Sequence, residues 1–122
     1  MIFYIDGETP AKKNSRIVNT KTGRSFPSKR YSQWHKDAML QVRSQKQNET
    51  IDQPCRIKMI FTHGDLRRRD SDNGTSSILD LLTDCGVLAD DKWQIVKSLQ
   101  IDNDYKKNEP SCRVEIEVYE QN

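Results

Sequence analysis

The chain has 122 residues, a length that suits one domain with one hydrophobic core and leaves too little material for a second. Its composition is polar, with 34% hydrophobic and 31% charged residues and a mean hydropathy of −0.90, and no stretch approaches the roughly 20 apolar residues of a membrane span. Acidic residues stand at positions 6 and 8, where a signal peptide would be apolar, so we expect a cytoplasmic protein that does not contact a membrane.

The first predicted element is a strand over residues 1–5, an apolar run that ends at the Asp6-Gly7 turn signal. The next residues, about 8–30, are rich in Pro, Gly, Lys, Asn and Ser, and we expect them to form a long, flexible, basic loop. A short hairpin around Thr22-Gly23 would interrupt this loop.

The charges of the chain are unevenly distributed. The net charge of +2 is too small to indicate a nucleic-acid partner by itself, but no acidic residue occurs between Glu8 and Asp37. A positive N-terminal third therefore contrasts with an acidic remainder. The basic residues of this third are Lys12, Lys13, Arg16, Lys21, Arg24, Lys29, Arg30 and Lys36.

A helical period begins at about Ser28, which is placed to cap the helix after Pro27. The pattern fades in the polar run at 43–50. We expect its aromatic residues to lie in the core rather than to stack on bases, and the histidine to be a packed or rim residue without a catalytic role. The apolar face consists of Tyr31, Trp34, His35, Ala38, Met39 and Val42.

Three further strands and a second helix follow. Alternating apolar residues predict strands over 55–61, over 93–101 beginning at Trp93, and over 112–118, with a polar turn at 102–110. Apolar residues at helical spacing predict a helix over about 73–85, ended by Gly86. This order predicts an α+β fold: a single domain, residues 1–122, with a small mixed β-sheet and two helices packed on one face.

The three cysteines, Cys55, Cys85 and Cys112, are widely spaced in apolar surroundings and include no C-x-x-C pair. They are typical of small core residues in a reduced, cytosolic protein. Because the ligand spacing of structural zinc is absent, we expect no zinc site.

Four aspartates bracket the second predicted helix. Asp70 and Asp72 are two apart at the end of a predicted strand, where alternate residues point to the same face, so their oxygens can share one hard cation. The "GVLADD" return could bring Asp90 and Asp91 towards them. Carboxylate donors without His or Cys suit Mg²⁺ or Mn²⁺ rather than zinc.

An arginine triplet stands directly in front of these acids, and its guanidinium groups would hold the phosphates that flank a scissile one. Metal for the scissile phosphate and arginine for its neighbours is the arrangement of a nuclease. A structural interpretation stays open, in which Asp72 caps the helix and Asp90-Asp91 is a solvated turn. The triplet consists of Arg67, Arg68 and Arg69.

The segment "RRRDSDN", a helix, "GVLADD" and an apolar strand together resemble the RusA family of Holliday junction resolvases. "TPAKKNSR" and "RYSQWHKDA" are similar to the opening loop and first helix of that family, so the resemblance runs from about Phe3 to Val118. It implies a Mg²⁺-dependent endonuclease, with Mn²⁺ as an alternative ion. Such an enzyme acts as a homodimer, binds four-way or branched DNA by shape and nicks two strands symmetrically.

The resemblance also assigns roles to single residues. Asp70, Asp72 and Asp91 match the catalytic acids of the family, and Asp90 adjoins them as a further metal ligand. Where the family often has a lysine, four residues after the second acid, this chain has Ser76. A lysine there would neutralise phosphate charge or assist proton transfer. The residues available to replace its charge are Lys12, Lys13 and Lys92.

A junction-binding protein gives the basic stretch a role, because such a loop could line a DNA face and become ordered when phosphate arrives. The alternative is a solvated, flexible loop. The residues expected to bind DNA are Lys12, Lys13, Asn14, Arg16, Arg24, Lys29, Arg30, Arg67, Arg68 and Arg69.

Two other functions compete with a resolvase. The first is a non-catalytic, branched-DNA binding protein in which Ser76 marks a lost active site. The second is a small-molecule phosphohydrolase, which would need a deep apolar pocket. No G-x-x-x-x-G-K phosphate loop is present, so we expect no nucleotide cofactor. The edge of the strand at 112–118 is one candidate for the dimer surface.

Overall fold

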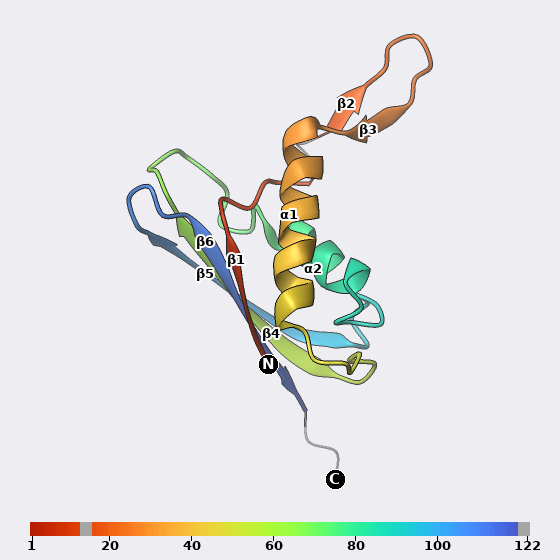
Figure 1. Ribbon diagram of the computed structural model, residues 1–122, viewed down its shortest axis with the longest axis vertical. Helices are drawn as coiled ribbons and strands as arrows, with labels where there is room; N and C mark the ends of the chain where they lie inside the picture. Colours follow the sequence, from red (N-terminus) through yellow and green to blue (C-terminus); the bar gives the residue numbers. More distant parts are fainter. Residues whose placement is uncertain (13–15, 120–122) are drawn as a thin grey trace.

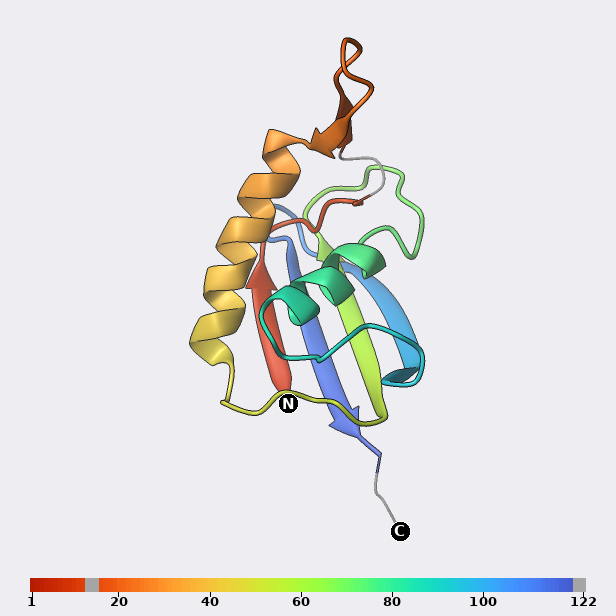
Figure 2. The same cartoon turned by 90° about the vertical axis from the view of Figure 1, so that its right-hand side faces the viewer.

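The computed structural model describes residues 1–12 and 16–119, without the side chain of Arg16. Its main elements are β1 (Ile2–Asp6), α1 (Lys29–Gln45), β4 (Cys55–His63), α2 (Thr75–Asp84), β5 (Val96–Tyr105) and β6 (Ser111–Val118). The four strands form one sheet in the order β1-β6-β4-β5, in which β4 and β5 are parallel and the other neighbours antiparallel. Both helices cover the same face of this mixed sheet (Figures 1 and 2), which confirms the predicted fold class.

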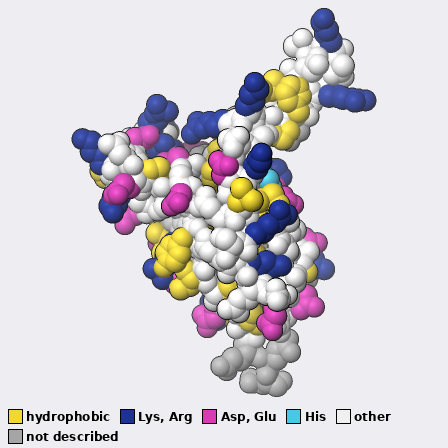
Figure 3. Space-filling model, viewed as in Figure 1, with side chains coloured by type: hydrophobic (Ala, Val, Ile, Leu, Met, Phe, Trp, Pro, Cys, Tyr) yellow, Lys and Arg dark blue, Asp and Glu magenta, His cyan; other side chains and the backbone are white. Residues whose placement is uncertain are grey.

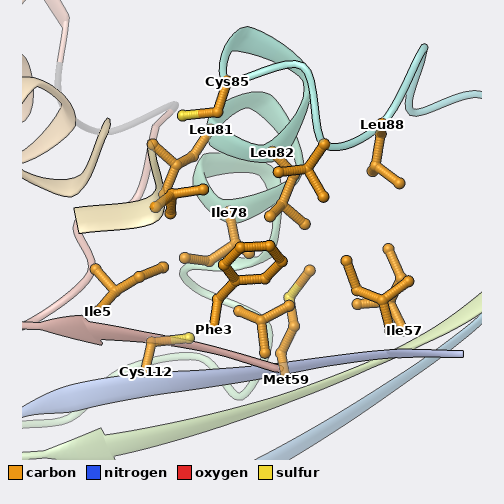
Figure 4. Packing of buried hydrophobic residues seen from close by; sticks show 14 of the residues in the cluster. Phe3, Ile5, Ile57, Met59, Ile78, Leu81, Leu82, Cys85, Leu88 and Cys112 are labelled. Atoms are coloured by element: carbon orange, nitrogen blue, oxygen red, sulfur yellow. The ribbon is translucent and has the colours of Figure 1, made fainter. Parts of the chain in front are cut away.

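Alternation along the strands places the core on the helix side of the sheet. In β4 every second residue from Cys55 to Phe61 is buried, and β1 and β6 alternate in the same way. Apolar residues of α2 meet these side chains from the other layer (Figure 4). All three cysteines are free and buried, as predicted. The centre of the core contains Phe3, Ile5, Ile57, Met59, Ile78, Leu81 and Leu82.

The side chains of α1 protect the open edge of the sheet at β1. Gln45 forms two hydrogen bonds of 2.8 Å with the backbone of Tyr4, and Gln41 accepts one of 2.7 Å from the N–H of Asp6. An edge strand otherwise presents unpaired backbone groups that invite pairing with another chain. The predicted cap of α1 is confirmed, because the Ser28 hydroxyl accepts a hydrogen bond from the backbone N–H of the third helical residue.

The aromatic residues of α1 belong to the core and its rim, as predicted. Tyr31 is buried and Trp34 packs against the core cluster. His35 is half-buried, stacks on Tyr31 with ring centroids 5.9 Å apart, and contacts Asp84 through Nε2 at 3.0 Å. These contacts join α1 to the end of α2.

Two predictions about the last strands were wrong. Trp93 lies in the turn before β5 and is 71% exposed, since β5 begins only at Val96. β5 is an edge strand with mostly exposed side chains, so the alternation of residue types there does not mark a buried face. The strand continues to Tyr105, so the turn that follows it is shorter than predicted. β6 lies between β1 and β4, so both of its edges are paired and neither is available to a partner chain.

Parts of the predicted loop at 8–30 form regular or buried structure. β2 (Arg16–Val18) and β3 (Ser25–Pro27) form an antiparallel hairpin that projects beyond the N-terminal end of α1 (Figure 1), so the hairpin around Thr22-Gly23 is confirmed. Thr9 and Ala11, in contrast to the expectation of a flexible loop, are buried. The reason is a contact with α2, where the buried Ser77 hydroxyl donates a hydrogen bond to the carbonyl of Pro10 at 2.5 Å.

The stability of the fold depends on the packing of α2 against the sheet. Leu82 is fully buried, so Leu82→Ala should lower the free energy of unfolding by about 2–5 kcal/mol, because it reduces apolar burial and leaves a cavity. Leu40→Ala is the matched control, because Leu40 on α1 is 62% exposed and its truncation should change stability by less than about 0.5 kcal/mol. Urea denaturation followed by circular dichroism measures both, and equal effects of the two substitutions would contradict this description of the core.

Candidate active site

A pocket of about 450 Å³ lies on the flank of α2, between the turns that precede this helix and the return segment that follows it. Three of the four predicted acids line it, although they come from segments about 20 residues apart in sequence. The pocket also contains a lysine and a fourth carboxylate from α2 itself. Its lining residues are Lys12, Asp70, Asp72, Asn73, Ser76, Leu79, Asp80 and Asp91.

Asp70 and Asp72 do not follow a strand end directly, in contrast to the prediction. β4 ends at His63, and the two acids lie in consecutive turns closed by hydrogen bonds from Asn73 N to Asp70 O at 3.1 Å and from Thr75 N to Asp72 O at 3.2 Å. These turns, rather than strand alternation, bring both carboxylates to one pocket. Asp72 is not a side-chain cap of α2, since the capping position is Gly74 and no side chain caps it. Within the described residues, neither carboxylate has a hydrogen bond or an ion pair.

Close packing at Gly74 sets the position of these turns. A Cβ atom at this residue would lie 2.8 Å from Cε1 of Phe61 and 2.9 Å from Cγ2 of Thr9. Only glycine therefore lets the start of α2 approach β4 and the segment after β1 this closely. The same segment leads directly to Lys12, so the packing also brings this lysine to the pocket.

Lys12 and Asp80 form an ion pair inside the pocket. The hydrogen bond with Asp80 raises the pKa of Lys12, so its ammonium group stays charged. The aspartate pairs in the sequence did not point to Asp80, but helical spacing could have found it. Asn73, Ser76 and Asp80 recur at three and four residues along the polar face of the same segment.

Asp91 and Asp90 have different positions. Asp91 lines the pocket, whereas Asp90 does not and instead accepts a hydrogen bond of 2.7 Å from the Asp91 backbone N–H. Partial desolvation is the main cause that raises the pKa of Asp91. The hydrogen bond and the negative charge of Asp90 raise it further, and so does the negative charge of Asp80. A cation in the pocket would relieve the repulsion between these carboxylates.

The chemistry of the pocket fits a hard divalent cation. Its acidic residues offer only carboxylate oxygens, and neither His nor Cys lines it, which is the donor set that Mg²⁺ and Mn²⁺ prefer. In residues 1–12 and 16–119, however, no three His, Cys, Asp or Glu side chains are already grouped closely enough to hold a metal ion. The carboxylates therefore share a pocket without surrounding a metal position completely. A Mg²⁺ ion does not require complete enclosure, because it usually keeps several waters and binds only one or two carboxylates.

The arginine triplet divides into two parts. Arg69 is only 15% exposed and pairs with Asp65 at 2.8 Å and with Glu8 at 3.2 Å, so its guanidinium group already has partners within the protein. The hydrogen bond from Arg69 lowers the pKa of Asp65 to about 2. Arg67 and Arg68 are exposed and line a hollow of about 220 Å³ beside the acidic pocket, and Arg69 and Glu8 line the same hollow.

Arg30 from α1 lines the same hollow as Arg67 and Arg68, and Asn73 lines both this hollow and the acidic pocket. A basic surface built from two distant segments thus adjoins the carboxylates. This is the arrangement expected for holding phosphates next to a reacting one.

The other residues expected to bind DNA are scattered. Lys13 and Asn14 lie outside the described residues, as does the side chain of Arg16. Arg24 lies in the hairpin and Lys29 at the start of α1, and both are exposed. Figure 3 shows Lys and Arg side chains on the projecting arm that β2 and β3 form. Lys12 differs from these residues, because it pairs with an acid in the pocket instead of adding to a basic face.

The fold and the pocket define a small α+β domain with a carboxylate-lined site beside a basic hollow. The chain belongs to the RusA endodeoxyribonuclease family, because the family model described as endodeoxyribonuclease RusA matches residues 6–119. It is also 28% identical over 82 residues to the crossover junction endodeoxyribonuclease RusA of Aquifex aeolicus (strain VF5). That alignment covers 67% of this chain and 65% of the Aquifex protein, less than two thirds of its length. No described helix is long and apolar enough to cross a membrane.

Proposed function

We propose that the protein is a cytoplasmic, Mg²⁺-dependent endodeoxyribonuclease that resolves four-way DNA junctions by paired nicks. The observation that carries this proposal is the pocket that unites Asp70, Asp72 and Asp91 in a chain of the RusA family. Three free, buried cysteines are in keeping with a reducing compartment.

The carboxylates of Asp70, Asp72 and Asp91 would hold the divalent ion, Mg²⁺ or Mn²⁺. When bound, the ion supplies Lewis-acid stabilisation of the charge that develops on the scissile phosphate. The ammonium group of Lys12 adds a positive charge to the same pocket. Asp90 is left out of this set, because its carboxylate is engaged with the backbone of the neighbouring turn.

Binding of the DNA would depend on other residues. Three exposed arginines line the basic hollow beside the pocket, and they would hold the phosphates on either side of the cut. They are Arg30, Arg67 and Arg68. The projecting hairpin also carries Lys and Arg side chains (Figure 3), which would add phosphate contacts. Because these contacts are electrostatic, affinity for the junction should fall steeply as salt rises.

Paired nicks need two pockets, and we propose that a homodimer supplies them. Two-fold symmetry in the protein would then match the symmetry of a four-way junction, so that equivalent strands are cut. A monomer at micromolar concentration in light scattering would contradict this part of the proposal.

A second function, a non-catalytic branched-DNA binding protein, is favoured by one observation. Ser76 lines the pocket at the position where the family often has a lysine. The presence of Lys12 in the same pocket weighs against a non-catalytic protein. Lys12 can supply, from a different segment, the charge that a lysine at position 76 would supply.

The test is incubation of the purified protein with a labelled four-way junction and with a matched linear duplex, each with Mg²⁺ or with a chelator. We expect nicks at symmetric positions in the junction, only with the metal, and little cleavage of the duplex. Tight junction binding without a cut would favour the binding protein, and cleavage of both substrates would remove the junction specificity.

A further inference from the structure

A polar network lies behind the turns that carry Asp70 and Asp72. It joins His63 at the end of β4, Asn103 on β5, and Glu8 in the segment after β1. These residues do not line the acidic pocket. The network nevertheless reaches the backbone of Ser71, which lies between Asp70 and Asp72. None of them was singled out by the sequence pattern.

The contacts form a continuous chain. The amide nitrogen of Asn103 donates a hydrogen bond of 2.9 Å to the carbonyl of Ser71. The amide oxygen of Asn103 lies 2.8 Å from Nε2 of His63, and Nδ1 of His63 lies 2.8 Å from a carboxylate oxygen of Glu8. The other carboxylate oxygen of Glu8 pairs with Arg69 at 3.2 Å.

The side chains of this network are fixed by their contacts. The Ser71 carbonyl can only accept, so it faces the amide nitrogen of Asn103, and the amide oxygen of Asn103 faces Nε2 of His63. Nδ1 of the same ring faces the carboxylate of Glu8. Each partner thus restricts the orientation of the next.

Asn103 makes an unusual contact with the acidic turns. The backbone hydrogen bonds of Asp70 and Asp72 close the turns locally. Within the described residues, the bond from Asn103 is the one hydrogen bond from a side chain to the backbone of residues 70–72. It spans 32 positions in sequence and ties these turns to the edge strand of the sheet. The Ser71 carbonyl belongs to the backbone that joins the two residues, so this bond restricts the turns from which both carboxylates project.

We propose that Asn103 is a positioning residue of the acidic pocket, held by His63 and Glu8, which fixes the peptide unit between Asp70 and Asp72. This inference rests on the proposed function, since it assigns Asn103 to the site where the cation would bind. Asn103 itself is exposed, so its substitution should change the free energy of unfolding by less than about 0.5 kcal/mol. Its effect should appear in the pocket instead.

Two substitutions test the donor that Asn103 offers to Ser71. Asn103→Leu removes both hydrogen bonds without a change of charge. Asn103→Asp keeps an acceptor for His63 but removes the donor, and its added negative charge would by itself strengthen the binding of a cation. We expect both variants to weaken Mn²⁺ binding, measured by calorimetry without DNA, and to raise the Mg²⁺ concentration for half-maximal cleavage, each about 10- to 100-fold.

Gln100→Met is the matched control. Gln100 is an exposed amide on the same strand whose side chain donates to Asp102 at 3.1 Å, away from the acidic turns. It should bind Mn²⁺ like the wild type. Junction binding in chelator and the melting temperature should also stay unchanged in all three variants, which separates a positioning role from a general loss of structure.

The outcomes distinguish this inference from the function on which it rests. If the wild type binds Mn²⁺ and cuts the junction but both Asn103 variants behave like Gln100→Met, the positioning role is overturned and the proposed function stands. If only Asn103→Leu is impaired, the contact with His63 matters and the donor to Ser71 does not, which also overturns the inference. A wild type that neither binds Mn²⁺ nor cuts would overturn both.

Discussion

Asp72→Asn should reduce cleavage of the four-way junction by at least about 1,000-fold and leave junction affinity in chelator within about tenfold of the wild type. The carboxylate of Asp72 lines the pocket and has no partner among the described residues, so a cation is its natural counter-charge. Removing it takes away charge stabilisation at the reacting phosphate. The basic groups proposed to hold the DNA are unchanged, because they lie in the neighbouring hollow and on the hairpin.

Asp90→Asn provides a control of the same chemistry at a neighbouring acid. The Asp90 side chain does not line the pocket, and an asparagine there can still accept the hydrogen bond from the backbone N–H of Asp91. Cleavage should therefore stay within a few-fold of the wild type. Single-turnover cleavage and gel-shift titration measure the two properties separately. If Asp72→Asn weakened junction binding by orders of magnitude, the division between metal-binding acids and DNA-binding bases would be wrong.

Lys12→Met should slow cleavage about 100-fold, because it removes the positive charge that the pocket holds next to Asp80. Ser76→Lys in the same chain should then restore most of the rate. Ser76 lies four residues before Asp80 on α2 and lines the same pocket as Lys12. A lysine at position 76 can therefore place its charge where Lys12 places it now. Ser76→Lys alone should change the rate little, since Lys12 already supplies the charge.

Lys29→Met is the control for the removal of a lysine as such. Lys29 is exposed at the start of α1 and lies outside the pocket, so its substitution should weaken DNA binding without slowing the cut at saturating protein. If Lys29 binds one phosphate of the junction, its removal should reduce the slope of log K against log salt by about 0.9. Unchanged cleavage by Lys12→Met would show that Lys12 only ties its segment to α2, and failure of Ser76→Lys to restore it would show that position matters as well as charge.

Most of the secondary structure, and the acidic residues that line the candidate site, could be predicted from residue order alone. Strict alternation identifies β4 and β6, because these central strands bury one face, and helical spacing identifies α1 and α2. Alternation was a poor guide at β5, an edge strand whose side chains are mostly exposed. Carboxylates without His or Cys indicated a hard cation from residue type, before any position was known.

Which of these groups share a pocket depends on how the elements pack in three dimensions. Asp70, Asp72 and Asp91 meet because consecutive turns and the return after α2 place them on one flank of the helix, whereas Asp90 does not line the pocket. Arg69, unlike Arg67 and Arg68, is only 15% exposed. It pairs with Asp65 and Glu8 within the protein, which the sequence did not indicate.

The side-chain contacts between distant residues could not be predicted from the sequence either. His63 meets Glu8 and Asn103 across separations of 55 and 40 residues, and Lys12 meets Asp80 across an even longer one. Local patterns arise from the period of a helix or strand and can be read along the chain. Contacts of this kind arise from the packing of whole elements, which brings residues together without leaving a periodic signal in the sequence.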